Sequence, residues 1–366
     1  MPKEMVSSIR TPVKRENAER FVLLSLVSFA STVILTRGFL ALTGYPQLGG
    51  GELHIAHVLW GGLFLFVGGL FPLILANRWA LNYSAILNGI GMGLFIDEVG
   101  KFITQNNDYF YPPAAPIIYS IFLLTVLVYL QVRKPPSRNS RAEMYRVLEG
   151  ITEILDGDLE PAELHELKAR LQQITLNIST PDAARLANDL MQYFETHEFR
   201  LNTPQPGKLQ RIMYDIRVNY ERYLTRKLSL SIIAIGFLLF ATANLIQIFT
   251  LILIWFDPNT TISDFLYPLV MQAQVRNLTE AYMMFARIGL DAVIAFVLIV
   301  AFCLILIKKV EKGINLGSAA LLISLVVLNL LVFYIDQFQA VFRTLLYLSL
   351  FSFSVHFRRR YIKHSQ

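Results

Sequence analysis

The amino-acid sequence predicts an all-α membrane protein with about eight transmembrane helices, and three of its features support this prediction. Hydrophobic residues make up 54% of the 366-residue chain and charged residues only 16%, whereas a soluble domain averages about 25% charged residues. The apolar residues form blocks of about 20, the length that a helix needs to cross a hydrocarbon core roughly 30 Å thick. Lysine and arginine are concentrated beside alternate blocks, as in the cytoplasmic loops of membrane proteins. The net charge of +6 therefore reflects membrane topology, and we expect no nucleic acid partner.

The first half of the chain, residues 1–134, contains four of these apolar blocks. We predict that they span the bilayer at about residues 21–42, 54–76, 81–103 and 116–132. Basic residues precede the first block and follow the second and fourth blocks, whereas the connections after the first and third blocks contain neither lysine nor arginine. The positive-inside rule therefore places the N-terminus in the cytoplasm and these two connections outside.

The middle of the chain, residues 135–227, is polar and charged and has helical periodicity. Apolar residues recur on one helix face at Leu164, Leu167, Leu171 and Ile174 and on another at Ile212, Ile216 and Tyr220. This spacing predicts a cytoplasmic segment of about four helices. The segment is also a candidate docking site for a cytoplasmic protein partner.

The second half of the chain, residues 228–366, contains four further apolar blocks. We predict that they span the bilayer at about residues 228–255, 281–307, 316–335 and 340–356. Basic residues again follow the second and fourth of these blocks, so both termini are predicted to lie in the cytoplasm. The bilayer is then the principal partner, and a homo-oligomer stays open because no segment of the sequence argues for or against it.

Two short segments in corresponding positions indicate an internal repeat. Phe95-Ile96-Asp97-Glu98 ends the third block, and Tyr334-Ile335-Asp336-Gln337 ends the seventh. In both halves one more apolar block and a basic cluster follow. An even number of spans in each half gives both halves the same orientation, which predicts a parallel duplication of four plus four helices. A chance similarity of four residues is the alternative.

Polar side chains gather at the outer ends of the first three blocks. They are Arg37, Glu52, His54, His57, Asp97, Glu98 and Lys101. The second block begins outside and the third ends outside, so we expect these residues at one membrane depth. His54 and His57 share a helix face, and Asp97 and Lys101 have the i,i+4 spacing of an intrahelical ion pair. Charge at such a depth costs roughly 2.5–3.5 kcal/mol per group, so it usually has a partner or a function.

The second half has a counterpart to this set at the same predicted depth. Its members are Arg287, Asp291, Asp336 and Arg343. Arg287 and Asp291 are spaced i,i+4 and can pair along one helix. This counterpart has as many positive as negative members and contains no histidine.

Two interpretations of the polar residues require no bound metal. In the first, the charges are salt bridges that lock helix ends, with Arg37 paired to Asp97 or Glu98, and the protein is a membrane scaffold. In the second, the residues form a path for proton- or ion-coupled transport, in which histidine and carboxylate side chains titrate.

A third interpretation is a metal site that makes the protein a metal-dependent membrane enzyme. His54, His57, Asp97 and Glu98 are suitable ligands for zinc, iron or manganese. A bound metal could activate water for hydrolysis within the membrane. The nearby Lys101 would compete for the carboxylates, which argues against this interpretation.

Small residues in the second and third blocks predict close helix packing. Gly61 and Gly62 lie in the second block, and Gly89 and Gly93 are four residues apart in the third. Such spacing lets two helix backbones approach closely. We therefore expect a tight pair formed by the second and third helices, which carry the histidines and carboxylates.

Two longer segments resemble a family of uncharacterised bacterial multi-pass membrane proteins. They are GGGELHIAHVLWGG, residues 49–62, and GLFIDEVGKFI, residues 93–103. The resemblance covers mainly the first four spans. It implies a location in the bacterial inner membrane and implies no activity, so the interpretations above stay open.

Overall fold

The computed structural model describes residues 12–44, 56–134, 140–157, 159–176, 181–199, 201–202, 224–256, 278–335 and 337–362. Its regular structure in these ranges is helical, with no β-strand. Eight helical stretches among the described residues are long and apolar enough to cross a membrane. The all-α, multi-pass fold predicted from the sequence is therefore confirmed.

The first four membrane helices agree with the predicted blocks to within a few residues. They are α2 (Ala18–Thr43), α3 (His57–Ile74), α4 (Arg78–Asp97) and α6 (Ala114–Val132). The predicted third span is divided, because α4 ends at Asp97 and a short helix, α5 (Val99–Ile103), follows. Glu98 between them has φ −90° and ψ 9°, so its backbone departs from helical geometry.

Internal contacts divide the chain into two compact units. The first unit contains Met1–Asp97 and Leu124–Arg211, and the second contains Glu98–Leu123 and Ile212–Gln366. These boundaries differ from the three predicted segments, residues 1–134, 135–227 and 228–366. The polar helices of the middle segment group with the first membrane helices, and the chain from Glu98 to Leu123 groups with the helices of the second half.

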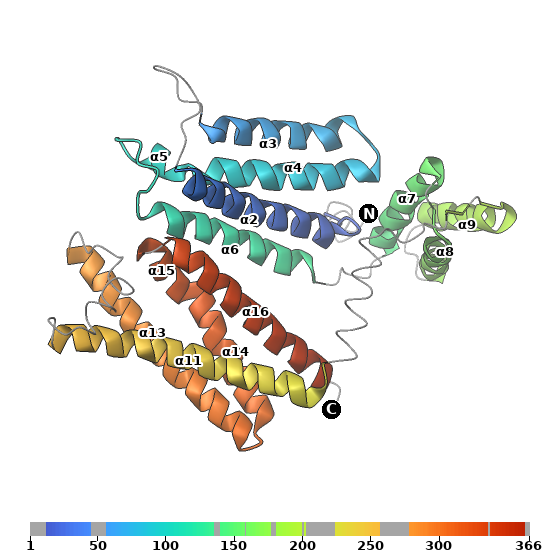
Figure 1. Ribbon diagram of the computed structural model, residues 1–366. Coiled ribbons are helices and arrows are strands. Elements are labelled where there is room, and N and C mark those ends of the chain that lie inside the picture. The colour runs from blue at the N-terminus through green and yellow to red at the C-terminus, as the bar shows by residue number, and fades with distance from the viewer. Residues whose placement is uncertain are drawn as a thin grey trace, which may run out of the picture. The chain divides into compact units, whose positions relative to one another are not determined.

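In the first unit, α4 packs against both α2 and α3 (Figure 1). Glycine makes both approaches close. A Cβ atom on Gly91 would lie 2.7 Å from the carbonyl oxygen of Gly61 in α3, and one on Gly93 would lie 2.7 Å from Cβ of Thr32 in α2. Gly89 also contacts α2. The sequence therefore predicted close packing of α4 correctly, but Gly89 and Gly93 serve its contact with α2 and not with α3.

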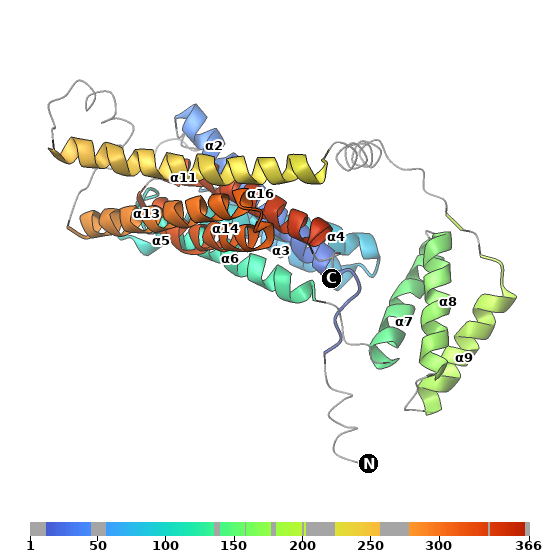
Figure 2. The ribbon, with the colours of Figure 1, turned by 90° about the horizontal axis from the view of Figure 1, so that it is seen from below.

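Three polar helices form a small bundle within the first unit (Figure 2). They are α7 (Ser140–Asp156), α8 (Pro161–Leu176) and α9 (Pro181–Thr196). The bundle has its own buried core of Met144, Val147, Leu159, Leu167, Leu171, Ile174, Ala187 and Phe194. Three of these residues belong to the apolar face that the sequence predicted on α8. The second predicted face, with Ile212, Ile216 and Tyr220, lies outside the described residues.

The second unit contains four further membrane-crossing stretches. They are α11 (Arg226–Phe256), α13 (Leu278–Leu306), the run of α14 (Val310–Ile323), η1 (Ser324–Leu328) and α15 (Asn329–Ile335), and α16 (Gln337–Tyr361). Their shared core includes Phe237, Leu298, Leu321 and Leu328. Tyr119 of α6 also lies in this core.

A widened turn interrupts the seventh membrane stretch. Residues Ser324–Leu328 form a π-helix, in which the backbone N–H of Asn329 donates to the carbonyl oxygen of Ser324. The hydroxyl of Tyr119 donates to the carbonyl oxygen of Leu325 at 2.5 Å, and its ring stacks on Phe333 at 4.6 Å between centroids. A π turn shifts the backbone hydrogen-bond pattern by one residue, which leaves a carbonyl oxygen available to this side chain.

Candidate functional site

One fully buried aspartate joins the three packed membrane helices of the first unit. Asp97 is the last residue of α4, and its side chain has 0% exposure. Nε of Arg37 in α2 donates to Oδ1 of Asp97 at 2.6 Å. Nε2 of His57, the first residue of α3, lies 3.2 Å from Oδ2. We call Arg37, His57 and Asp97 the Asp97 cluster, and the end of the first unit where it lies the cluster end.

The course of the helices explains why these three residues meet. The helices α2 and α4 both run toward the cluster end, and α3 runs away from it. An aspartate that ends α4 and a histidine that begins α3 therefore reach the same level. Close packing at the glycines of α4 brings the helices near enough for direct contact between side chains.

The Asp97 cluster contains one permanent cation and one group that can change its charge. Arginine stays protonated at all accessible pH values, so Arg37 supplies a permanent positive charge beside the carboxylate of Asp97. Histidine is the side chain whose ordinary pKa lies nearest to neutrality. Uptake of one proton by the imidazole of His57 would change the net charge of the cluster from zero to +1. The arrangement thus places an imidazole and a guanidinium beside one carboxylate that is buried among three helices.

Glu98 and Lys101 form a separate ion pair next to Asp97 in the sequence. Oε1 of Glu98 lies 2.5 Å from Nζ of Lys101, and the carboxylate side chain is only 1% exposed. Nζ of Lys101 also lies 5.6 Å from the ring centroid of Tyr109. The sequence suggested Asp97 as the intrahelical partner of Lys101. The change of backbone geometry at Glu98 separates Asp97 from the α5 turn, and the structure pairs Lys101 with Glu98 at i,i+3.

The predicted metal ligands are only partly described. Glu52 and His54 lie outside the described residues. His57 and Asp97 are in contact with each other, and Glu98 pairs with Lys101. Within the described part of the chain, no group of three histidine, cysteine, aspartate or glutamate side chains is placed to hold a metal ion. A metal at this site would use His57 and Asp97 and would need a further ligand such as His54.

The predicted counterpart in the second unit also centres on a buried aspartate. Asp291 of α13 has a side-chain exposure of 4%, and Oδ1 accepts a hydrogen bond from the guanidinium of Arg343 in α16. Nε of Arg287 lies 3.6 Å from Oδ2. We call Arg287, Asp291 and Arg343 the Asp291 cluster. Asp336, the fourth predicted member, lies outside the described residues.

Sequence reasoning missed two polar residues beside the Asp291 cluster. The guanidinium of Arg343 lies 5.2 Å from the ring centroid of Tyr347, and the hydroxyl of Tyr347 donates to Oδ1 of Asn244 in α11 at 3.3 Å. The i,i+4 spacing of Arg343 and Tyr347 is a signal that could have identified the tyrosine. Asn244 comes from a distant part of the sequence, so no local spacing could have identified it.

A second polar contact missed by sequence reasoning lies between α3 and α4. The hydroxyl of Ser84 donates to the carbonyl oxygen of Gly68 at 2.7 Å, and Nδ2 of Asn88 donates to the carbonyl oxygen of Ser84 at 2.8 Å. Ser84 and Asn88 are spaced i,i+4 near the middle of α4. Only the bond from Ser84 to Gly68 joins two helices, and a bond of this kind strengthens helix association in membranes by roughly 0.6 kcal/mol.

Comparison with known proteins gives no family assignment. No protein-family model, no curated protein and no solved structure matches the chain significantly. A function must therefore be argued from the geometry of the chain itself.

Proposed function

We propose that this multi-pass membrane protein is a proton-coupled transporter of the bacterial inner membrane, with the Asp97 cluster as its proton-binding site. The observation that carries this proposal is the convergence of Arg37 and His57, from two different helices, on one carboxylate with 0% exposure. Buried ionisable residues in membrane helices commonly mark proton relays and solute paths.

The proposed orientation places the cluster near the outer face of the membrane. Arg78, Arg133 and Lys134 lie in the connections at the opposite end of the first unit. Basic connections stay on the cytoplasmic side. The beginning of α2 and both chain termini are then cytoplasmic as well.

The presence of a histidine favours a proton-binding role over a purely structural ion pair. Arg37 alone is sufficient to neutralise Asp97 and join α2 to α4. His57 adds an imidazole, the side chain that proteins commonly use as a proton shuttle, and it does so from α3. Protonation would therefore strengthen the attraction between α3 and α4 without changing the contact between α2 and α4. Proton binding therefore favours the helix arrangement in which α3 and α4 are in contact, because that arrangement binds the proton more tightly.

Proton flux into sealed vesicles tests the proposal. The purified chain is reconstituted with a pH-sensitive dye inside, and flux is driven by an imposed potential. We expect flux in the unaltered protein and its loss in His57→Gln and Asp97→Asn. Asp156→Asn, the same carboxylate-to-amide change at an exposed residue, is the matched control and should leave the flux unchanged. Equal flux in all variants, or no flux above empty vesicles, would contradict the proposal. If neither the unaltered protein nor the variants carry flux, and the variants have lower thermal stability, the result would instead favour a membrane scaffold.

The contact between His57 and Asp97 also favours a second candidate, a metal-dependent membrane hydrolase. These two side chains are suitable ligands for zinc, iron or manganese, and His54 lies three residues before His57. Elemental analysis of the purified protein tests this candidate. Stoichiometric metal that disappears in the double variant His54→Ala, His57→Ala would support it, and a metal-free protein would contradict it.

A further inference from the structure

Helix α7 has three faces with different chemistry. One face packs into the core of the polar bundle through Met144 and Val147. A second face is acidic and carries Glu149, Glu153 and Asp156. The third face carries three exposed apolar residues: Tyr145 with 54% exposure, Leu148 with 44% and Leu155 with 82%. Their i, i+3 and i+10 positions lie on one side of a helix, and we call them the α7 stripe.

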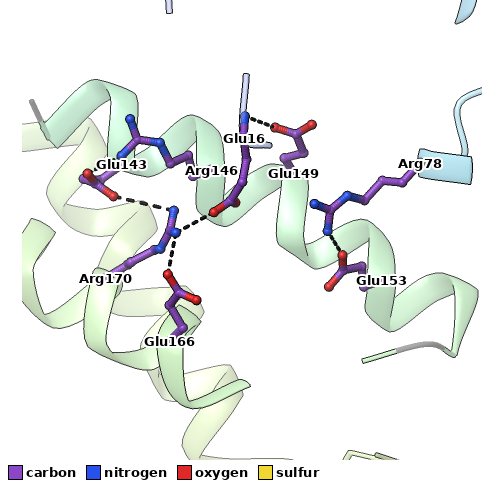
Figure 3. A network of polar contacts seen from close by, with 8 residues as sticks. All are labelled: Glu16, Arg78, Glu143, Arg146, Glu149, Glu153, Glu166 and Arg170. Atoms are coloured by element: carbon purple, nitrogen blue, oxygen red, sulfur yellow. Dashed lines mark hydrogen bonds and ion pairs between the residues drawn. The ribbon is translucent and has the colours of Figure 1, made fainter. Parts of the chain in front are cut away.

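The acidic face holds α7 against the turn that precedes α4. The guanidinium of Arg78, the first residue of α4, pairs with the carboxylate of Glu153 (Figure 3). Nδ2 of Asn77 donates to both carboxylate oxygens of Asp156, at 2.9 and 3.1 Å. The C-terminal half of α7 therefore lies at the point where α4 begins.

A second set of contacts holds the bundle beside the beginning of α2. The backbone N–H of Glu16 donates to Oε2 of Glu149 at 3.3 Å, and Arg15 pairs with the other oxygen at 3.3 Å. The carboxylate of Glu16 accepts a hydrogen bond from Arg170 of α8 at 2.5 Å, as Figure 3 shows. Arg170 also binds Glu166, at 2.6 Å. The bundle is thus attached at the beginning of both α2 and α4.

The guanidinium of Arg170 stays positively charged in this network. Burial of its guanidinium lowers the pKa, but the hydrogen bonds to Glu166 and Glu16 and the charges of both carboxylates outweigh burial and raise the pKa above its ordinary value. The guanidinium therefore stays protonated throughout the accessible pH range, and its contacts persist. The position of α7 beside the membrane helices does not depend on a titration of Arg170.

These attachments fix the level of α7 relative to the bilayer. Residues 15–17 directly precede α2, and Asn77 and Arg78 lie at the start of α4, so we infer that both sites lie at the boundary between hydrocarbon and water. A helix bound to both sites lies at the level of the lipid headgroups. The core face and the acidic face of α7 are covered by protein contacts. The α7 stripe is not covered by the bundle and is exposed on its surface.

The chemistry of the α7 stripe matches anionic headgroups. Tyrosine is enriched at membrane interfaces, and leucine binds the boundary of the acyl chains. The guanidinium of Arg141 lies 5.4 Å from the ring centroid of Tyr145, which places a positive charge on the stripe itself. Lys14 donates to the backbone carbonyl oxygen of Lys134 at 3.0 Å, so these two basic residues of the unit are in contact. Each basic residue near an anionic surface contributes about 1 kcal/mol of attraction.

We propose that α7 is a membrane-surface helix whose stripe lies among the headgroups of anionic lipids, with the positive charge of Arg141 at the edge of the stripe. This inference concerns a surface remote from the Asp97 cluster and does not depend on proton transport. It assigns the exposed apolar side chains of α7 to lipid, in place of a cytoplasmic protein or a second copy of the chain.

Lipid-dependent quenching of a fluorescent label tests the proposal. Cys303, the single cysteine of the chain, is exposed on α13 and is first replaced by serine. An environment-sensitive dye is then attached at Leu148→Cys in one sample and at Gln192→Cys, an exposed position of α9, in the control. The full chain is reconstituted in equal amounts of phosphatidylglycerol and phosphatidylcholine with a quencher attached to the lipid headgroup.

We expect several-fold stronger quenching at position 148 than at position 192. The difference should decrease in pure phosphatidylcholine and in the Arg141→Gln variant, because both changes remove charge attraction. A label at Leu155→Cys should repeat the result and excludes an artefact of one position. Equal quenching at 148 and 192, or access of aqueous iodide to both dyes, would overturn the proposal. Quenching at 148 that depends on protein concentration would also overturn it and would indicate a second copy as the partner.

Discussion

The two units each contain a buried aspartate in contact with two basic side chains, and the clusters differ in one residue type. Asp97 contacts an arginine and a histidine that come from two neighbouring helices, α2 and α3. Asp291 contacts two arginines, one on its own helix and one on α16. The Asp97 cluster thus contains an imidazole beside its carboxylate, whereas the basic members of the Asp291 cluster are both guanidinium groups. On this difference rests our proposal that the Asp97 cluster binds a proton and that the Asp291 cluster only joins helices.

Removal of the central carboxylate gives the largest expected effect and should be similar in both units. Asp97→Ala leaves one buried arginine and Asp291→Ala leaves two without their carboxylate, and breaking such a buried pair costs about 3–5 kcal/mol. Denaturant unfolding in detergent measures this loss. The two variants should lose similar stability, but only Asp97→Ala should abolish proton flux. If Asp291→Ala abolished flux while retaining stability, the distinction between the clusters would be wrong.

Added volume at the α3–α4 contact should disturb the Asp97 cluster alone. In Gly61→Ala the new Cβ would lie 2.7 Å from the backbone nitrogen of Phe95 and 2.9 Å from the carbonyl oxygen of Gly91. Overpacking of this kind costs about 1–3 kcal/mol, and it should move His57 away from Asp97.

The neighbouring Gly62 is the matched control for this prediction. A Cβ at Gly62 meets no atom within 4 Å, so Gly62→Ala should leave stability unchanged. Thermal unfolding of both variants checks the difference. Equal midpoints would show that α3 and α4 do not require the close approach at Gly61.

Replacement of the histidine should change pH dependence more than stability. Glutamine at position 57 retains a hydrogen-bond donor for Asp97, so we expect a loss of only about 1 kcal/mol. Proton flux in the unaltered protein should depend on pH and should be low and flat in His57→Gln, because the imidazole is the proposed proton-binding group. Arg343→Lys, which keeps a cation at the other cluster, should retain the normal pH profile. A profile that is unchanged in His57→Gln would remove the reason for treating the two clusters differently.

The ion pairs that attach α7 provide the smallest expected effect. The Arg78 and Glu153 side chains are 25% and 14% exposed, and pairs near the surface contribute about 0.2–1 kcal/mol. Arg78→Gln should therefore leave the unfolding midpoint almost unchanged. Hydrogen exchange should nevertheless become faster in α7, because one attachment is lost. Unchanged exchange in α7 would show that the remaining contacts hold the helix without Arg78.

Local patterns in the sequence were sufficient to predict where the helices lie in the chain. They were insufficient to predict which helices contact each other. The blocks predicted at 21–42 and 116–132 agree closely with α2 (Ala18–Thr43) and α6 (Ala114–Val132), because apolar length is a property of one segment. The partner helix of Gly93 was predicted wrongly, because spacing identifies a small face and not the helix that packs on it. The π turn at Ser324–Leu328 has no signal in composition or charge. The parallel four-plus-four repeat stays a prediction, since Asp336 lies outside the described residues.

The sequence by itself determined which segments are long and apolar enough to leave water, and it identified Arg37, His57 and Asp97 as polar residues in a costly environment. Only the tertiary structure decided that these three meet, that Lys101 binds Glu98, and that Tyr119 joins the core of the second unit. The physical reason is one of range. Transfer from water depends on the side chains of a single helix, whereas ion pairs and hydrogen bonds depend on distances of about 3 Å. Those distances are set by how closely, and in which rotation, one helix packs against another.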